Sequence, residues 1–149
     1  MKKRTFRRAQ ETDFVSLLDL LRDLHQKDIP ATKAQSKTAW KEILKSDGIR
    51  HYLVEAEGVL VAACHFVVVP NLTRGAKPYG VIENVVTRKE WRRQGIGTRL
   101  LRYVLKEAWA LGCYKVMLMT GREDAHPFYE KAGFKPGLKT AFVAKPEER

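Results

Sequence analysis

The chain has 149 residues, of which 44% are hydrophobic and 30% charged. This composition excludes disordered, collagen-like and coiled-coil proteins, and the length predicts one domain, residues 1–149, that buries its core without disulfides or metals. The formal net charge of +11 predicts an anionic partner: nucleic acid, an anionic lipid surface or a phosphate-rich cofactor.

The two cysteines, Cys64 and Cys113, lie in apolar segments without Cys-x-x-Cys spacing, which argues against a disulfide scaffold or a zinc site and fits a reducing compartment. The four histidines show no metal-ligand spacing, so no metal site is predicted. The basic N-terminus lacks the apolar stretch of an export signal, and the longest nearly apolar run, residues 59–69, is shorter than the ~20 residues that span a bilayer. We therefore expect a soluble, cytoplasmic protein.

The N-terminal half predicts two helices and a β-hairpin. Residues 3–8 favour a short edge strand, and a helix is expected to begin near Glu11 or Thr12 and to end before Pro30, since apolar residues recur every three or four positions. A second helix is predicted over residues 33–45. Residues 49–56 and 59–69 favour two strands joined by a tight turn, and the second strand is apolar on both faces, as a central strand is.

The C-terminal half alternates strands and helices after a loop at residues 70–78. Strands are predicted over residues 79–87 and 115–120, helices over 96–111 and 124–131, and a last extended segment contains residues 140–143. The predicted fold class is α+β, with a mixed, mostly antiparallel sheet flanked by helices.

Between the strand at 79–87 and the helix at 96–111 lies the glycine-rich segment Arg92-Arg93-Gln94-Gly95-Ile96-Gly97. Glycines allow main-chain N–H groups to approach a ligand, and the first turn of a helix offers unpaired N–H donors, so the segment predicts an anion site suited to a pyrophosphate. A Walker loop is absent, and Leu100 stands where a dinucleotide fingerprint needs a third glycine. The alternative is a tight turn before a capped helix.

The spacing of Arg92, Gly95 and Gly97 fits the pattern Gln/Arg-x-x-Gly-x-Gly/Ala, and the segment Ala125-His126-Pro127-Phe128-Tyr129-Glu130-Lys131-Ala132-Gly133-Phe134 follows downstream. With these two motifs the chain resembles the GNAT superfamily of N-acetyltransferases, most strongly over residues 80–134. The resemblance implies a three-layer acyl-CoA N-acyltransferase fold and acetyl-CoA as the cosubstrate. It places the pantetheine arm on the backbone of Val85, Val86 and Thr87, and the pyrophosphate on the loop formed by Arg92, Arg93, Gln94, Gly95, Ile96, Gly97 and Thr98.

Tyr129 occupies the position of the usual acid in this family. When a thioester is attacked, the departing thiolate needs a proton or a hydrogen bond, and a phenol with an ordinary pKa of about 10 is protonated at pH 7 and can donate it. The alternative is an aromatic side chain that only packs on a short helix.

Glu83 is the candidate general base, acting through water. It interrupts an apolar run of the strand, where we expect its carboxylate to be desolvated and its pKa raised. The alternative is a carboxylate satisfied by an arginine or by His65 of the neighbouring strand. Relatives often carry Asn seven residues before the tyrosine, whereas this chain has Arg122.

The sequence therefore predicts transfer of an acetyl group from acetyl-CoA to a primary amine, with a small molecule as the expected acceptor. The acceptor is expected between the N-terminal helices, the loop at 70–78 and the final segment, which includes Lys139 and Phe142. Dimerisation is common in the family, so a homodimer stays open. The two alternatives are a non-catalytic acyl-CoA sensor and a basic nucleic-acid-binding domain; the absence of a binding motif and of aromatics interleaved with basic residues argues against the latter.

Overall fold

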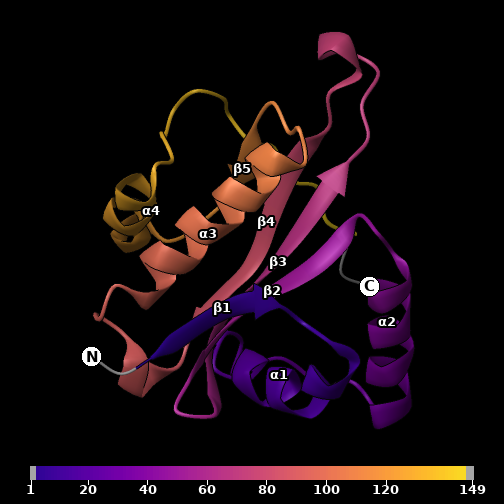
Figure 1. Cartoon of the computed structure of the whole chain (residues 1–149), viewed down its shortest axis with the longest axis vertical. Coiled ribbons are helices and arrows are strands. Elements are labelled where there is room, and N and C mark those ends of the chain that lie inside the picture. Colours follow the sequence, from indigo (N-terminus) through magenta and orange to yellow (C-terminus); the bar gives the residue numbers. More distant parts are fainter. Residues whose placement is uncertain (1–2, 147–149) are drawn as a thin grey trace.

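The computed structural model describes residues 3–146, which form a five-stranded sheet in the order β1-β2-β3-β4-β5 (Figure 1). The strands are β1 (Arg4–Arg8), β2 (Ile49–Ala56), β3 (Val59–Val69), β4 (Tyr79–Thr87) and β5 (Val116–Leu118). Neighbouring strands from β1 to β4 are antiparallel, whereas β4 and β5 are parallel. The predicted mixed, mostly antiparallel sheet is confirmed.

Helices cover both faces of the sheet and give the three layers that the resemblance implied (Figure 1). The α-helices are α1 (Phe14–Leu21), α2 (Lys33–Lys45), α3 (Ile96–Ala110) and α4 (His126–Ala132), and short 3-10 turns are η1 (Glu11–Asp13), η2 (Arg74–Ala76), η3 (Lys89–Trp91) and η4 (Glu123–Ala125). On one face, α3 and α4 pack on a core that includes Cys64, Phe66 and Ile82. On the other face, α1 and α2 pack on a second core that includes Leu53 and Ala63.

Most of the predicted elements are present within a few residues of their expected bounds. The turn between β2 and β3 is made by Glu57 and Gly58, whose φ angles of 54° and 77° are those that a tight hairpin requires. The predicted first helix is too long, because α1 ends at Leu21 and polar turns follow where the apolar stripe stops. Residues 140–143 lie outside any strand, and Phe142 is 93% exposed.

The sheet opens between β4 and β5. Pairing is limited to Gly80 with Val116, Val81 with Met117 and Ile82 with Leu118, so β4 continues to Thr87 without β5. At the paired end, the ring of Phe66 occupies the space beside Gly80, since a Cβ there would lie 2.4 Å from Phe66 Cε2. Only glycine fits at this crossing.

A β-bulge lies just past the point where β4 and β5 separate. His65 pairs with Glu83 and Ala63 pairs with Val86, so two residues of β4, Asn84 and Val85, lie opposite the single residue between His65 and Ala63 on β3. Asn84 adopts the left-handed conformation with φ of 51°. Because a bulge bends the strand that carries it and increases its twist, this one helps to turn the end of β4 away from β5.

Two histidines stack beneath α2. His51 of β2 and His65 of β3 are direct cross-strand partners, their ring centroids lie 4.5 Å apart, and the ring of Trp40 lies 5.9 Å from His51. Burial lowers the pKa of His51 to about 4, with a further decrease caused by His65. Burial also lowers the pKa of His65, against the opposing effect of Glu83. Both imidazoles are therefore neutral at pH 7.

This buried pair predicts loss of stability in mild acid. The unfolded chain protonates His51 below its ordinary pKa of 6.5, whereas the folded chain resists protonation until about pH 4, so the free energy of unfolding falls between these values. For His51 the loss is about 3 kcal/mol. Urea unfolding at pH 7 and pH 4 measures it, and His51→Phe should show a smaller loss between the two pH values. Exposed His25 provides the control, because His25→Gln should lose as much stability as the parent chain. An equal acid loss in His51→Phe and the parent would contradict the assignment.

Candidate active site

A cleft of about 700 Å³ lies where β4 has separated from β5. It is bordered by the end of β4, by the loop and first turn of α3, by η4 and α4, and by the segment that follows α1. All of the predicted cofactor-binding residues except Gln94 line this cleft, as does Tyr129. Residues separated by more than forty positions in the sequence are thus brought to one place.

The wall formed by β4 is a strand edge. On the side away from the cleft, β4 pairs with β3 through Val86 and Thr87, while Val85 lies in the bulge. On the cleft side, no strand of the described chain pairs with these three residues. Such an edge binds extended ligands that carry amide groups, because these can take the place of a neighbouring strand. The edge is therefore suited to a chain of amides.

The floor of the cleft is the N-terminus of α3. Gly95 is the N-cap residue, with φ of 71°, and no side chain of the described residues caps the helix. Arg93 also has a positive φ, 58°, so the loop turns sharply and directs the first amides of the helix outward. Helix N-terminal amides of this kind attract anions.

Side chains on either side hold this loop in place. Arg92 Nε donates a hydrogen bond of 3.0 Å to the carbonyl oxygen of Thr87, which ties the loop to the end of β4. Arg4 donates one of 3.0 Å to Gln94 Oε1. The Gln94 side chain is engaged with β1, which explains why it does not line the cleft.

Arg88 lies outside the cleft. Its guanidinium donates hydrogen bonds to Leu60 O and to the carboxylate of Asp19, so it joins α1 to the sheet.

Gly97 brings α4 close to α3. Its backbone is ordinary helix, but a Cβ at this position would lie 2.9 Å from Phe128 Cε2, so the absence of a side chain permits the contact. Phe128 in turn packs beside Tyr129, with ring centroids 4.8 Å apart. The glycine loop and the tyrosine are therefore positioned by one another.

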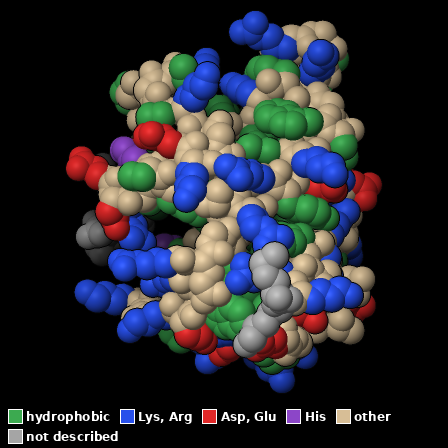
Figure 2. All heavy atoms as spheres, turned by 60° about the vertical axis from the view of Figure 1, so that its left-hand side comes forward, with side chains coloured by type: hydrophobic (Ala, Val, Ile, Leu, Met, Phe, Trp, Pro, Cys, Tyr) green, Lys and Arg blue, Asp and Glu red, His purple; other side chains and the backbone are tan. Residues whose placement is uncertain are grey.

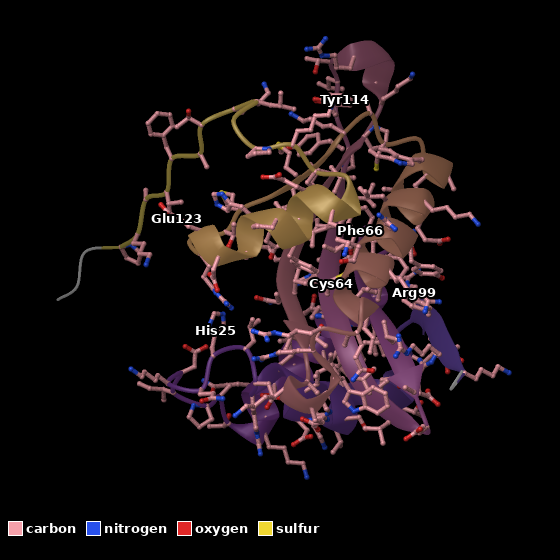
Figure 3. The ribbon with its side chains drawn as sticks, turned by 90° about the vertical axis from the view of Figure 1, so that its left-hand side faces the viewer. His25, Cys64, Phe66, Arg99, Tyr114 and Glu123 are labelled. Carbon is pink, nitrogen blue, oxygen red and sulfur yellow. The ribbon has the colours of Figure 1, made fainter. Side chains whose placement is uncertain are left out.

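Tyr129 lies half-buried on α4, with its ring against Phe128 and edge-on to Phe134. Burial raises the pKa of its phenol, Arg122 lowers it, and Glu83 and Cys64 raise it. The net effect is an increase, so the hydroxyl is protonated at neutral pH and can act as a donor. Figure 3 shows Cys64 in the interior behind α4.

Arg122 stands where the resemblance led us to expect Asn. It forms an exposed ion pair of 2.7 Å with Asp124, and both residues line the cleft. Its charge acts on Tyr129, as described above. The substitution therefore replaces a neutral amide by a cation next to the candidate acid.

Glu83 does not line the cleft, whose β4 wall starts two residues further on at Val85, and it also differs from our expectation of burial. It directly follows Ile82, the last residue of β4 that pairs with β5, and its side chain is exposed. The predicted desolvation is wrong, because the separation of the two strands opens this position to solvent. Glu83 is a cross-strand partner of His65 and acts electrostatically on Tyr129.

Sequence reasoning missed several lining residues. Asp23 and Leu24 line the cleft from the segment that follows α1, and Lys131 lines it from α4. In Figure 3, His25 of the same segment lies below Glu123 of η4. The loop at 70–78, in contrast, lies at the opposite end of β4 (Figure 1). No motif marks Asp23 or Leu24, since only tertiary packing brings them to the site.

The surface around the site is basic. Figure 2 shows Lys and Arg side chains spread over this face, several of them bordering a hollow. Among residues 3–146 no group of three or more His, Cys, Asp and Glu side chains could hold a metal ion. In the same part of the chain, no helix is long and apolar enough to cross a bilayer.

Comparison with known proteins identifies the family to which the chain belongs. The model of the acetyltransferase (GNAT) family matches residues 14–134. Glucosamine 6-phosphate N-acetyltransferase from Trypanosoma brucei brucei is 30% identical over 128 residues, 85% of each chain, and a probable glucosamine 6-phosphate N-acetyltransferase from Oryza sativa is 32% identical over 139 residues, 86% of this chain and 80% of the other.

Solved structures show the same fold. A putative acetyltransferase from Agrobacterium tumefaciens superposes with a TM-score of 0.90 at 36% identity, covering 95% of this chain and 99% of that one. An aminoglycoside N-acetyltransferase solved with CoA has a TM-score of 0.80 at 17% identity, covering 97% and 96%, a likeness of fold alone. With the family model matching most of its length, the chain belongs to the GNAT family of N-acetyltransferases.

Proposed function

We propose that this protein transfers the acetyl group of acetyl-CoA to the primary amine of a small molecule, with glucosamine 6-phosphate as the first acceptor to test. The observation that carries the proposal is the convergence of three features in one cleft: the free edge of β4, the uncapped N-terminus of α3 and the protonated Tyr129.

The cleft fits acetyl-CoA in its chemistry. The backbone of Val85, Val86 and Thr87 would pair with the amides of the pantetheine arm, and the main chain from Arg93 to Thr98 would hold the pyrophosphate. Gly95 supports this arrangement, because nothing lies within 4 Å of a Cβ built there and the space over the helix N-terminus stays open. The thioester supplies the activated acetyl group.

The transfer needs two proton movements. An alkyl ammonium with an ordinary pKa near 10.4 must lose a proton before its nitrogen can attack, and Glu83 is the group proposed to accept it through water. The nitrogen then bonds to the acetyl carbon, the carbon–sulfur bond breaks, and Tyr129 donates a hydrogen bond or proton to the departing sulfur. A phenol whose pKa is raised is a stable donor for this step.

The acceptor is proposed from the relatives and from the charges of the cleft. The Trypanosoma and rice relatives are named for glucosamine 6-phosphate. Outside the loop that carries Arg92 and Arg93, the cleft is lined by the cations Arg122 and Lys131 and the anions Asp23 and Asp124. An amine that also carries a phosphate is complementary to both kinds of charge.

The acceptor is tested by a matched pair of amines. With acetyl-CoA present, glucosamine 6-phosphate should give a kcat/KM at least tenfold above that of glucosamine, because only the former carries the anion. Release of free CoA thiol measures both. A protein that binds acetyl-CoA but acetylates neither sugar, and no other primary amine in a wider panel, would instead be a sensor.

Replacement of Tyr129 distinguishes a role as the acid from a role in packing alone. Tyr129→Phe removes only the hydroxyl, so kcat should fall about 10- to 100-fold, while the dissociation constant of acetyl-CoA in calorimetry stays within twofold. Tyr103→Phe, on α3 away from the cleft, is the control and should keep the parent kcat. An unchanged kcat in Tyr129→Phe would remove the phenol from the reaction.

Gly97→Ala tests the contact between the loop and α4. The added methyl group meets the ring of Phe128, so this ring must move and α4 is expected to shift with it, and kcat/KM should fall at least tenfold with a stability loss of about 1–3 kcal/mol. Gly121→Ala is the matched control, since nothing lies within 4 Å of its Cβ and its φ is not positive. Equal kinetics of the two variants would show that the α3–α4 contact does not position the site.

A further inference from the structure

Three titratable side chains form a row across the sheet. His51 of β2 lies opposite His65 of β3, and His65 lies opposite Glu83 of β4. Direct cross-strand partners point to the same face with Cβ atoms about 4.5–5.5 Å apart. The row therefore leads from the buried ring of His51, beside Trp40, to the exposed Glu83, whose charge acts on Tyr129 of the cleft.

Packing alone does not account for the two histidines. His51 Nδ1 and His65 Nε2 are buried and have no hydrogen-bond partner among the described residues. The rings stack with an interplanar angle of 22°, a geometry in which they cannot bond to each other through their edge nitrogens. Since an unsatisfied buried polar atom is costly, apolar side chains of the same size would pack better here.

The charges that act on the two histidines come from within the row, and outside it Glu83 also acts on Tyr129 of α4. His51 is affected by burial and by His65, whereas His65 is affected by burial and by Glu83. The helices that cover this face contribute apolar side chains to it, Leu17 and Leu20 from α1 and Trp40 from α2. Glu83 is thus the anion that favours a proton on His65, and burial together with the neutral His51 opposes it.

The bulge in β4 directs Glu83 into this row. Asn84 and Val85 both lie opposite one residue of β3, Cys64. Glu83 therefore keeps its pairing with His65, while β4 bends beyond Glu83. Glu83 is also the first residue of β4 without a β5 partner. It therefore connects His65 with the stretch of β4 that, from Val85 onward, lines the cleft.

We propose that His65 is a positioning residue that shares with Glu83 the proton released by the acceptor amine, and that His51 holds its ring in place by stacking. This inference rests on the proposed function. The ammonium gives one proton through water to the Glu83–His65 pair, and the freed nitrogen attacks the acetyl carbon. The nitrogen–carbon bond forms, the carbon–sulfur bond breaks, the second amine proton is lost, and one proton returns to the sulfur, so that the amide, CoA thiol and one proton in solution result.

The pH profile of kcat/KM tests the shared proton. A carboxylate binds protons at lower pH than an imidazole, so His65→Gln should move the acidic limb down by at least 0.5 pH unit and reduce the plateau about tenfold. His51→Phe keeps a stacked ring without a titrating group, and its limb should stay within 0.3 unit of the parent. An acidic limb in His65→Gln that coincides with the parent limb would overturn the proposal.

NMR titration of the imidazole resonances gives a readout that needs no activity. Glu83→Gln is nearly isosteric and exposed, so the fold should persist, and the pKa of His65 should fall by at least 0.3 unit while that of His51 changes less. A His65 titration that does not respond to Glu83→Gln refutes the pair even in an active enzyme. If the parent binds acetyl-CoA but acetylates no amine, the proposed function fails, and the NMR result still decides whether Glu83 and His65 are coupled.

Discussion

The separation of β4 from β5 after Ile82 is the constraint on which the site depends. A parallel pair that continued to Thr87 would satisfy the edge of β4 and leave no wall for a ligand. The strands separate after three paired residues, at a bulge that a non-glycine residue, Asn84, makes with a positive φ. A left-handed non-glycine residue costs about 1 kcal/mol or more, and such local strain is found preferentially at functional sites. Here the bulge divides β4 into an end that pairs with β5 and an end whose edge is free.

In the proposed reaction, the two faces of the sheet serve the two substrates. The face covered by α3 and α4 provides the anion-binding helix N-terminus and the phenol, held together by the close approach of Gly97 and Phe128. The face covered by α1 and α2 carries the histidine pair and the residues that reach the cleft after α1. Glu83 belongs to β4 and Tyr129 to α4, and the charge of Glu83 still acts on the phenol of Tyr129.

The sequence predicted what local patterns determine. Period-two and period-3.6 hydrophobicity located the strands and helices, while the glycine spacing around Gly95 and the segment around Tyr129 pointed to the proposed cofactor loop and the candidate acid. Burial of Glu83 was predicted wrongly, since an apolar run shows that a strand is central but not where its neighbour leaves it. The partners of Arg88 and Gln94 were also not predictable, because Asp19 and Arg4 are brought to them only by tertiary packing. The same holds for Asp23 and Leu24.

The segment that carries Asp23 and Leu24 belongs to no regular element and joins α1 to α2 through residues 22–32. It borders the cleft without contributing to the glycine loop, to α4 or to the paired strands. Residues there can therefore diverge, lengthen or shorten without disturbing the parts proposed to hold the thioester. If the proposed function holds, this architecture separates a variable module for choosing the amine from a constant module for donating the acetyl group, and directed evolution of new acceptors then has a defined stretch of chain to randomise.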